Sequence, residues 1–433
     1  MKVVYDISKL GEGYPRAPAR TGLFRVVEKV AEGLVASPEC EVSFCATESF
    51  AAAVGCLAYL ESRPELQGVP FLSPRWTKLG RSLGDRLREA NAAVDGAEPS
   101  VAPEGRQGLK LHRRVERRLL ARAYRAVESP EPFDPRWLAG ADVFHSPHQP
   151  VPRGVRGVQR FLTCYDLIPL LYPQFCTPAQ ARFAEELLRS IEPGDWVVCI
   201  SQATKDDLCD RHAIDPARVF VTHLAAAPEL FYPCADAGRI AAARARYGIP
   251  DGSYLLSLST LEPRKNMEQV VRSFARLVQE ERVKDLSLVL VGARGWLDER
   301  LFETVSGYES LKGRIVITGY VADEDLAPLY SGALCFVFPS FYEGFGLPAL
   351  EAMQCGAPVV TSNTSSLPEV VGDAGIMLDP TDGEGLCQAV LRVYGDASLR
   401  ASMSKRSLER AALFSWEKCV AETVAAYKAA LAA

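Results

Sequence analysis

The sequence lacks the features that mark secreted, membrane-spanning and disulfide-rich proteins. No uninterrupted apolar stretch approaches the ~20 residues that cross a bilayer, and the N-terminus MKVVYDIS turns polar at Asp6, before a signal-peptide core could form. The twelve cysteines are scattered singly with no C-x-x-C pair, and several lie in apolar runs, where a free thiol behaves as a small hydrophobe. We therefore expect a cytoplasmic protein that is neither exported by a visible signal nor anchored by a spanning helix.

The sequence also lacks a strong net charge and two common cofactor motifs. Its net charge is −5, from 49 Lys and Arg residues against 54 Asp and Glu residues, which argues against a nucleic-acid partner. No G-x-G-x-x-G follows an expected strand, which argues against a dehydrogenase, and no D-x-D directly follows one. What is present is the composition of a packed protein, 48% apolar and 24% charged, and 433 residues are enough for at least two hydrophobic cores.

Short β-rich runs alternate with helical segments along most of the chain, which is typical of βαβ units around parallel sheets. Two prolines interrupt the periodicity near residues 226–236. We therefore predict an α/β fold of two Rossmann-like, doubly wound domains over residues 1–230 and 231–415 that face a cleft, with a helix over 416–431 that crosses back onto the first domain. The expected strands are VVYDIS (3–8), EVSFCA (41–46), DVFHS (142–146), RFLTCYD (160–166), WVVCIS (196–201), VFVTHLA (219–225), YLLSLS (254–259), SLVLVG (287–292), RIVITG (314–319), CFVFPS (335–340), PVVTS (358–362) and GIMLDP (375–380).

One region does not fit this alternation. Residues 92–108 contain two prolines and three glycines and are expected to form a loop or flexible insertion. The next segment, residues 109–127, is rich in arginine, and on a helix it would align Val115 and Leu119 on one stripe. Such a helix can lie on an anionic membrane surface, or it can be a solvated helix that packs on its own domain through that stripe.

The segment most informative about chemistry is FPSFYEGFGLPALEAMQCGAPVVTS (338–362). Its strand ends in a loop that contains Glu343 and two glycines, and a helix begins near Leu347. The glycines let a ligand approach the backbone, and the helix N-terminus offers free N–H groups and the positive end of a dipole to an anion. This pattern predicts a phosphate site with two carboxylates, Glu343 and Glu351, facing one crevice.

EGFGLPALE (343–351) resembles the E-x7-E signature of family-four retaining glycosyltransferases, which have the GT-B architecture of two facing Rossmann-like domains. LSTLEPRKN (258–266) resembles the same family's strand-to-loop motif, in which an Arg-Lys pair grips the donor diphosphate. On chemical grounds Arg264 offers a bidentate fork and Lys265 a point charge. The resemblance implies that Glu351 binds the donor ribose, that Glu343 binds the sugar hydroxyls, and that no metal or other cofactor is needed.

The resemblance extends over nearly all of residues 140–425 and, more loosely, to the RTGLFR turn (20–25). CISQATKDDL (199–208), TGYVADEDLAPLYSGA (318–333) and TSNTSSLPEVVGDAG (361–375) all resemble family segments. The donor-binding residues that it implies are Gly22, Ser201, Ser259, Arg264, Lys265, Val321, Glu343, Gly344, Phe345, Gly346, Leu347 and Glu351.

The sequence departs from the family pattern at two positions. Many members carry T-x-H-D with a His close to the reacting sugar, whereas this chain has TCYD (163–166), so Tyr165 replaces that His. A phenol with a pKa near ~10 is a poor base at neutral pH, and we expect Tyr165 to donate a hydrogen bond instead. His145 and His148 are substitutes at another strand end. The second departure is Ser259, which replaces a frequent glycine at a strand end near the donor phosphate.

These observations predict a retaining glycosyltransferase that moves a hexosyl unit from a nucleotide-diphosphate sugar to a hydroxyl of a glycan or lipid-linked acceptor, in cell-surface polysaccharide assembly. The expected catalytic residues are Glu343, Arg264, Lys265, Tyr165 and His145. Two alternatives stay open: a catalytically silent glycan-binding or assembly partner, and a nucleotide-sugar epimerase or phosphorylase on the same scaffold.

Overall fold

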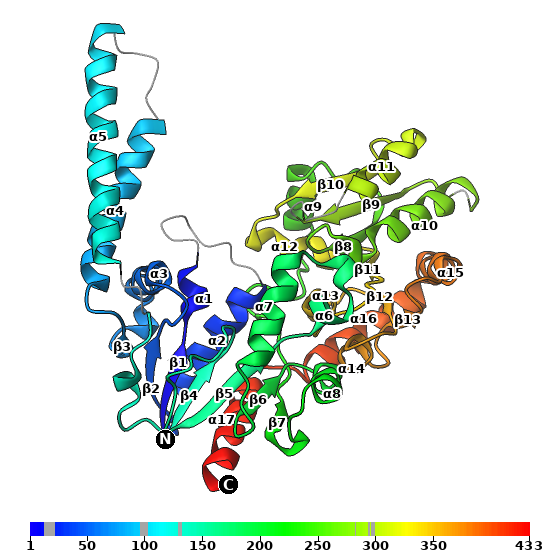
Figure 1. Ribbon diagram of the computed structural model, residues 1–433. Helices are drawn as coiled ribbons and strands as arrows, with labels where there is room; N and C mark the ends of the chain where they lie inside the picture. Colours follow the sequence, from blue (N-terminus) through cyan, green and yellow to red (C-terminus); the bar gives the residue numbers. More distant parts are fainter. Residues whose placement is uncertain (13–21, 96–102, 129–131, 282, 293–294, 296–298) are drawn as a thin grey trace. The chain divides into compact units, whose positions relative to one another are not determined.

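The computed structural model describes residues 1–12, 22–95, 103–128, 132–281, 283–292, 295 and 299–433. It contains two parallel β-sheets with helices around them (Figure 1). Each of the twelve expected strands is present, and one short strand, β3, has no counterpart among them. The α/β prediction with two doubly wound sheets is therefore confirmed.

The first sheet has the strand order β3-β2-β1-β4-β5-β6-β7. The chain winds outward from β1 in both directions, so the order reverses between β1 and β4. Its strands are β1 (Lys2–Asp6), β2 (Glu41–Cys45), β3 (Phe71–Leu72), β4 (Val143–Ser146), β5 (Gln159–Cys164), β6 (Trp196–Cys199) and β7 (Val219–Val221). The accompanying helices are α1 (Ser8–Gly11), α2 (Gly22–Ala36), α3 (Phe50–Glu61), α4 (Thr77–Asp95), α5 (Pro103–Val127), α6 (Ile168–Leu171), α7 (Pro178–Arg189) and α8 (Gln202–Arg211), with 3-10 turns at Pro64–Leu66, Pro135–Leu138, Pro173–Phe175 and Pro216–Arg218.

The second sheet repeats this winding with the order β10-β9-β8-β11-β12-β13, so its order reverses between β8 and β11. The strands are β8 (Ser253–Leu258), β9 (Leu286–Val291), β10 (Ile315–Gly319), β11 (Cys335–Phe338), β12 (Val359–Ser362) and β13 (Ile376–Leu378). The helices are α9 (Ala237–Arg246), α10 (Met267–Gln279), α11 (Glu299–Gly307), α12 (Asp323–Ser331), α13 (Leu347–Gln354), α14 (Leu367–Val371), α15 (Gly383–Gly395), α16 (Ala397–Ala411) and α17 (Trp416–Ala432), with 3-10 turns at Pro263–Lys265 and Glu309–Leu311.

The core of the second sheet explains its continuous apolar strands. Every residue of β9 is buried, because helices cover both faces of a parallel sheet. On α10, Val270, Val271 and Phe274 recur at helical spacing and belong to one buried cluster with Leu286 and Leu288 of β9. This packing holds the ends of β8 and β11 in fixed positions.

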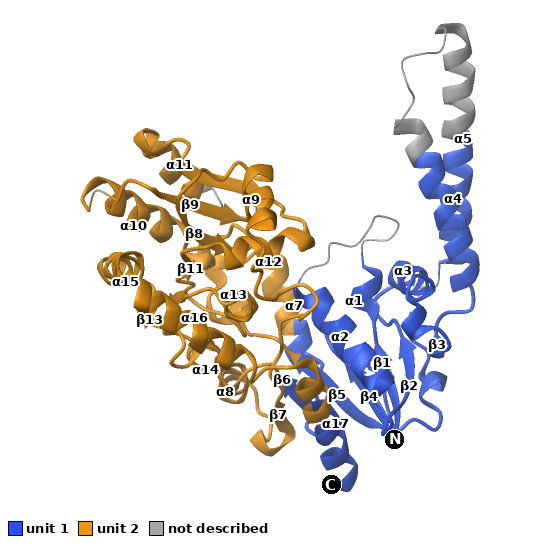
Figure 2. Ribbon diagram, turned by 180° about the vertical axis from the view of Figure 1, so that it is seen from behind, with its two compact units in different colours: residues 1–163, 186–198, 423–433 blue, residues 164–185, 199–422 orange. Residues whose placement is uncertain are grey.

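The chain divides into two compact units (Figure 2). Unit 1 comprises residues 1–163, 186–198 and 423–433, and unit 2 comprises residues 164–185 and 199–422. The boundary that the sequence suggests at residues 230 and 231 falls inside unit 2. The end of α17 belongs to unit 1, where the Tyr427 hydroxyl lies 2.5 Å from Nδ1 of His145.

Within unit 1, α4 and α5 lie side by side and form a long helical hairpin (Figure 1). The expected loop over residues 92–108 is therefore wrong at both ends, since 92–95 are the end of α4 and 103–108 begin α5; residues 96–102 lie outside the described part of the chain. Proline is favourable at the first position of a helix, so Pro103 starts α5 instead of interrupting it.

The face of α5 that packs against the rest of unit 1 also differs from the expected stripe. Leu120 is 7% exposed and the Tyr124 ring lies 6.0 Å from the Phe50 ring, whereas Val115 and Leu119 are 45% and 63% exposed. The expected apolar stripe therefore faces solvent, and the neighbouring stripe holds the helix to its unit.

Candidate active site

The second sheet brings the ends of β8 and β11 together at the point where its strand order reverses. The two strands pair in parallel, with Leu255 opposite Cys335 and Leu256 opposite Phe336. Their carboxyl ends therefore lie at the same edge, where open α/β sheets bind ligands. The loop after β8 carries Arg264 and Lys265, and the loop after β11 carries Glu343.

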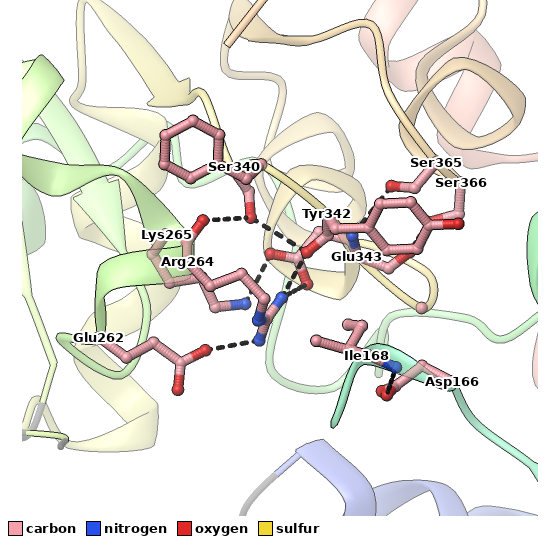
Figure 3. Close-up of polar contacts among 12 residues, drawn as sticks. Asp166, Ile168, Glu262, Arg264, Lys265, Ser340, Tyr342, Glu343, Ser365 and Ser366 are labelled. Atoms are coloured by element: carbon pink, nitrogen blue, oxygen red, sulfur yellow. Dashed lines mark hydrogen bonds and ion pairs between the residues drawn. The ribbon is translucent and has the colours of Figure 1, made fainter. Parts of the chain in front are cut away.

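These three side chains form a buried ion cluster (Figure 3). Nζ of Lys265 lies 2.6 Å from Oε1 of Glu343, and Nη1 of Arg264 lies 3.0 Å from Oε2 of the same carboxylate. On its other side, Nη2 of Arg264 lies 2.6 Å from Oε1 of Glu262. Lys265 is only 7% exposed and Glu343 only 6% exposed. The structure thus brings together three of the predicted site residues and adds Glu262.

The charges of this cluster shift one another's pKa values. Burial alone would raise the pKa of Glu343, but Arg264 and Lys265 outweigh it and hold that pKa at about 2, against an ordinary value of 4.5. Burial, together with the charge of Arg264, lowers the pKa of Lys265, and Glu343 offsets part of this effect. The Glu343 carboxylate is therefore charged at neutral pH and lies between two cations that are largely removed from water.

Asp166 faces the same cluster from the segment that follows β5. Burial raises the pKa of Asp166, and Arg264 is the nearby charge that most opposes this rise. Glu343 and Lys265 also act on it. The Asp166 side chain is fixed by a local hydrogen bond, because its Oδ1 accepts from the backbone N–H of Ile168 at 3.0 Å. The sequence placed Asp166 in TCYD but gave it no role.

The loop that carries Glu343 is fixed by hydroxyl and backbone contacts. The N–H of Glu343 donates to Oγ of Ser365 at 2.9 Å, and Oγ of Ser366 donates to the carbonyl of Glu343 at 3.0 Å. Gly344 is required by close approach, since a Cβ there would lie 2.4 Å from the carbonyl oxygen of Tyr165. Gly346 has φ of 96° immediately before α13, a conformation that favours glycine.

The loop that carries the two cations is fixed by Asn266. This residue adopts the left-handed conformation with φ of 58°, which asparagine tolerates better than most residues. Its side-chain amide donates to the carbonyl oxygens of Pro339, at 3.1 Å, and Pro380, at 2.7 Å. The Arg264–Lys265 turn is thereby tied to the end of β11.

Comparisons with known proteins identify the family of the chain. The family described as "Glycosyl transferases group 1" matches residues 240–410, a range that contains the whole Arg264, Lys265, Glu343 and Glu351 set. The O-antigen chain mannosyltransferase B of Escherichia coli is 36% identical over 287 residues, which are 66% of this chain and 74% of that protein. The chain belongs to the group 1 glycosyltransferases.

A second curated relative of this glycosyltransferase is much longer than this chain. The serotype-specific mannosyltransferase WbdA of Escherichia coli is 32% identical over 255 residues, which are 58% of this chain but only 31% of that protein. Among solved structures, the sucrose-phosphate synthase of Thermosynechococcus elongatus superimposes with a TM-score of 0.64 at 22% identity, covering 100% of this chain and 99% of that chain. The lipopolysaccharide glycosyltransferase WaaG gives a TM-score of 0.60 at 16% identity, covering 98% of each chain. The fold is GT-B.

Glu351 lies outside the ion cluster of the glycosyltransferase. It is buried in α13, and its Oε2 accepts a hydrogen bond from the Tyr330 hydroxyl at 3.2 Å. The two glutamates of the E-x7-E motif therefore have different environments, one between two cations and one beside a tyrosine.

The remaining donor-binding residues of the prediction fall into two groups. Ser259 is 6% exposed, and its hydroxyl has no hydrogen-bond partner within the described part of the chain. Ser201 has both partners it needs in α8, because its Oγ accepts from the N–H of Thr204 at 3.0 Å and donates to its hydroxyl at 2.9 Å. Ser259 is thus available to a ligand, while Ser201 caps a helix. Among the other predicted donor-binding residues, Val321 and Phe345 are buried. Leu347 is the first residue of α13, and Gly22 is the first residue of α2. Arg20 and Thr21 of the RTGLFR turn lie outside the described residues.

Tyr165 and the two strand-end histidines are not in the ion cluster. Burial raises the pKa of Tyr165, and the Cys419 thiol of α17 adds to this rise. His145 lies inside unit 1, where Nδ1 lies 2.5 Å from the Tyr427 hydroxyl and Nε2 lies 2.8 Å from the Thr163 hydroxyl. Burial lowers the pKa of both His145 and His148 to about 3. With both ring nitrogens engaged, the geometry of His145 favours a structural role.

Two features are absent from the described residues. No group of three His, Cys, Asp or Glu side chains there could hold a metal ion. None of the described helices combines the length and the apolar character needed to cross a bilayer.

Proposed function

We propose that this glycosyltransferase is a retaining, metal-independent enzyme that transfers a hexosyl unit from a nucleotide-diphosphate sugar to a hydroxyl of a glycan or lipid-linked acceptor. The sugar that we propose first is mannose, and the process is cell-surface polysaccharide assembly. The observation that carries the proposal is the pair of cations at the strand-order reversal of the second sheet, buried Lys265 and partly buried Arg264. Mannose and the polysaccharide acceptor rest on the names of the O-antigen relatives.

The cation pair suits the main electrostatic task of this reaction. When the bond between the anomeric carbon and the phosphate oxygen breaks, negative charge develops on the leaving diphosphate. Arg264 and Lys265 are preorganised to stabilise that charge, an effect typically worth about 3–4 kcal/mol for one well-placed donor. The acceptor oxygen then bonds to the anomeric carbon on the same face, and its proton passes to the departing phosphate oxygen. No protein base is required, which agrees with the engaged ring of His145.

Glu343 gives the site a second state. In the free protein its carboxylate forms an ion pair with each of the two cations. A diphosphate that binds them competes with this carboxylate, which is then available to accept hydrogen bonds from the hydroxyls of the donor sugar. The buried Ser259 hydroxyl, without a partner among the described residues, can donate to the same phosphate.

A thermal-shift panel of UDP, GDP, dTDP, ADP and CMP sugars tests the proposal. A donor at 100 times its Kd stabilises the protein by about 2.7 kcal/mol. Lys265→Ala should abolish the shift, and Arg276→Ala, which removes an exposed arginine paired with Glu280, should keep it. NMR of the product should show the anomeric configuration of the donor. Inversion, an epimerised donor without transfer, or binding without turnover would each overturn the proposal in favour of another class.

We also propose that the protein works at the membrane as a peripheral protein of the cytoplasm, through α5. Val115 and Leu119 are exposed, and so are Arg118, Arg122 and Arg125 on the same side of the helix. Within the described residues, no ion pair involves these three arginines. A surface of exposed aliphatic groups between unpaired arginines fits the headgroups and upper acyl region of an anionic bilayer.

Co-sedimentation with vesicles tests this contact. The protein should bind phosphatidylglycerol vesicles at low salt, release as salt rises, and ignore phosphatidylcholine vesicles. Leu119→Glu should weaken binding, whereas Leu413→Glu, at a position 55% exposed outside the hairpin, should not. Equal binding of the two variants, or no binding at low salt, would contradict a membrane role for α5.

A further inference from the structure

Helix α8 contacts the Glu343 loop through two side chains that lie one turn apart. Oδ2 of Asp207 accepts a hydrogen bond from the Tyr342 hydroxyl at 2.7 Å. The Thr204 hydroxyl lies 3.3 Å from the carbonyl oxygen of Gly344. Thr204 and Asp207 are three residues apart, so both project from one face of the helix. Residues 342 and 344, on either side of Glu343, are thus both attached to α8.

The N-terminus of α8 is attached to the same part of unit 2. The carboxylate of Glu369, in α14, accepts from the N–H groups of Gln202, at 2.9 Å, and Ala203, at 3.2 Å. A carboxylate is favourable at this position because it satisfies N–H groups that have no partner within the helix. The helix is therefore held at its start and at its middle, and it offers Asp207 as a fixed acceptor.

Tyr342 joins this support to the ion cluster. Its carbonyl oxygen accepts a hydrogen bond from Nη1 of Arg264 at 2.5 Å, and the next residue, Glu343, binds the same nitrogen. Its ring packs against the Tyr172 ring, with centroids 4.9 Å apart. A change in the Tyr342 backbone would therefore move both the carbonyl and the carboxylate that orient Arg264 (Figure 3).

We propose that Tyr342 and Asp207 are positioning residues of the transfer reaction, and that their hydrogen bond fixes the loop which aligns Glu343 and Arg264. This inference rests on the proposed function. Neither residue is assigned a contact with substrate. Burial and the neighbouring Asp207 carboxylate raise the pKa of Tyr342, so its hydroxyl keeps the proton that it donates.

The test compares Tyr342→Phe, Asp207→Ala and Asp207→Asn with a matched control. The control is Tyr394→Phe, because the hydroxyl of Tyr394, in α15, also donates a hydrogen bond to an aspartate, Asp285. With the donor that the panel identifies, Tyr342→Phe should lower kcat roughly 10- to 100-fold and change the donor KM by less than about 2-fold. Asp207→Ala should do the same, the double variant should be no worse than either, and Asp207→Asn should recover most of the rate because its amide oxygen accepts the same bond.

A second measurement separates this inference from the proposed function. Hydrogen exchange of the peptide that covers residues 341–346 should be faster in Tyr342→Phe than in wild type and unchanged in Tyr394→Phe. Wild-type exchange in Tyr342→Phe overturns the inference whether or not the protein transfers sugar. Wild-type kcat in that variant, or equal losses of stability and rate in both tyrosine variants, also overturns it. If the wild-type protein transfers no sugar, but Tyr342→Phe speeds exchange of the loop as stated, the proposed function is overturned and Tyr342 remains the anchor of the loop.

Discussion

The Glu343 carboxylate should stabilise the fold as well as the site, and Glu343→Gln tests both effects. Burial works against its charge, but Arg264 and Lys265 lower the pKa from 4.5 to about 2. A carboxyl whose pKa is lower in the folded protein stabilises the fold above its unfolded pKa, and this contribution is lost as the pH falls through the folded pKa. At 1.36 kcal/mol per unit, the difference corresponds to about 3 kcal/mol, similar to the cost of breaking a buried ion pair.

Urea unfolding at several pH values measures this contribution. At pH 7 we expect Glu343→Gln to be about 3 kcal/mol less stable than wild type, which lowers the Tm by roughly 6–12 °C for a unit of this size. The difference should stay constant from pH 8 to about pH 5 and should shrink between pH 4.5 and pH 2, where Glu343 takes up a proton in the unfolded wild-type chain but stays charged in the folded protein. Glu280→Gln, which removes a solvent-exposed partner of Arg276, should change nothing measurable.

The same variant distinguishes a donor site from a structural ion pair. If a diphosphate binds Arg264 and Lys265, it supplies the negative charge that Glu343→Gln removes. The nucleotide should then raise the Tm of the variant by at least as much as that of wild type, while kcat falls because the sugar hydroxyls lose their acceptor. Equal stability of variant and wild type at pH 7, a difference that grows as pH falls, or a nucleotide shift lost together with the carboxylate would refute the reasoning.

Three further predictions concern the donor. Arg264→Ala and Lys265→Ala should each cut donor use by at least about 100-fold in kcat/KM, because each removes one charge-stabilising group from the cluster, and circular dichroism should show that the fold is retained. Glu351→Ala should weaken binding of the free nucleotide, measured by calorimetry, with less effect on kcat, since its carboxylate lies beside Tyr330 and not between the cations. EDTA should leave turnover unchanged because two cationic side chains supply the positive charge, and a loss that Mg²⁺ or Mn²⁺ restores would contradict this.

The sequence predicts the fold well because parallel strands buried on both faces are written as short apolar runs. β9 and β11 are buried at every position, and their predominantly apolar sequences, LSLVLV and CFVF, predict this burial. The sequence does not predict β3, because two residues carry no periodicity. The sequence does not predict the hairpin, because the prolines and glycines of residues 92–108 are typical of a loop.

The site was predictable where one chain segment carries a motif and not where separate segments meet. Arg264, Lys265 and Glu343 each lie in a recognisable motif, and the reversal of strand order brings them together. Glu262 stands inside LSTLEPRKN but looks like an ordinary loop residue until Arg264 turns toward it. Asp207 lies in CISQATKDDL, but nothing in that segment indicates its role, because its partner Tyr342 lies 135 residues away and only the docking of α8 joins them.

The last prediction concerns Tyr165 and its neighbour Asp166. The sequence favours a hydrogen-bonding role for Tyr165, whose loss would cost about 1–3 kcal/mol of transition-state stabilisation. In the structure Tyr165 is partly buried near Cys419, whereas the pKa of Asp166 responds to the charges of Arg264, Glu343 and Lys265. We therefore expect Tyr165→Phe to keep turnover within about 3-fold of wild type and Asp166→Asn to lower it more than about 10-fold, since 1.36 kcal/mol corresponds to tenfold in rate. Steady-state turnover of both variants decides the matter, and a Phe variant that loses more activity than the Asn variant would return the role to Tyr165.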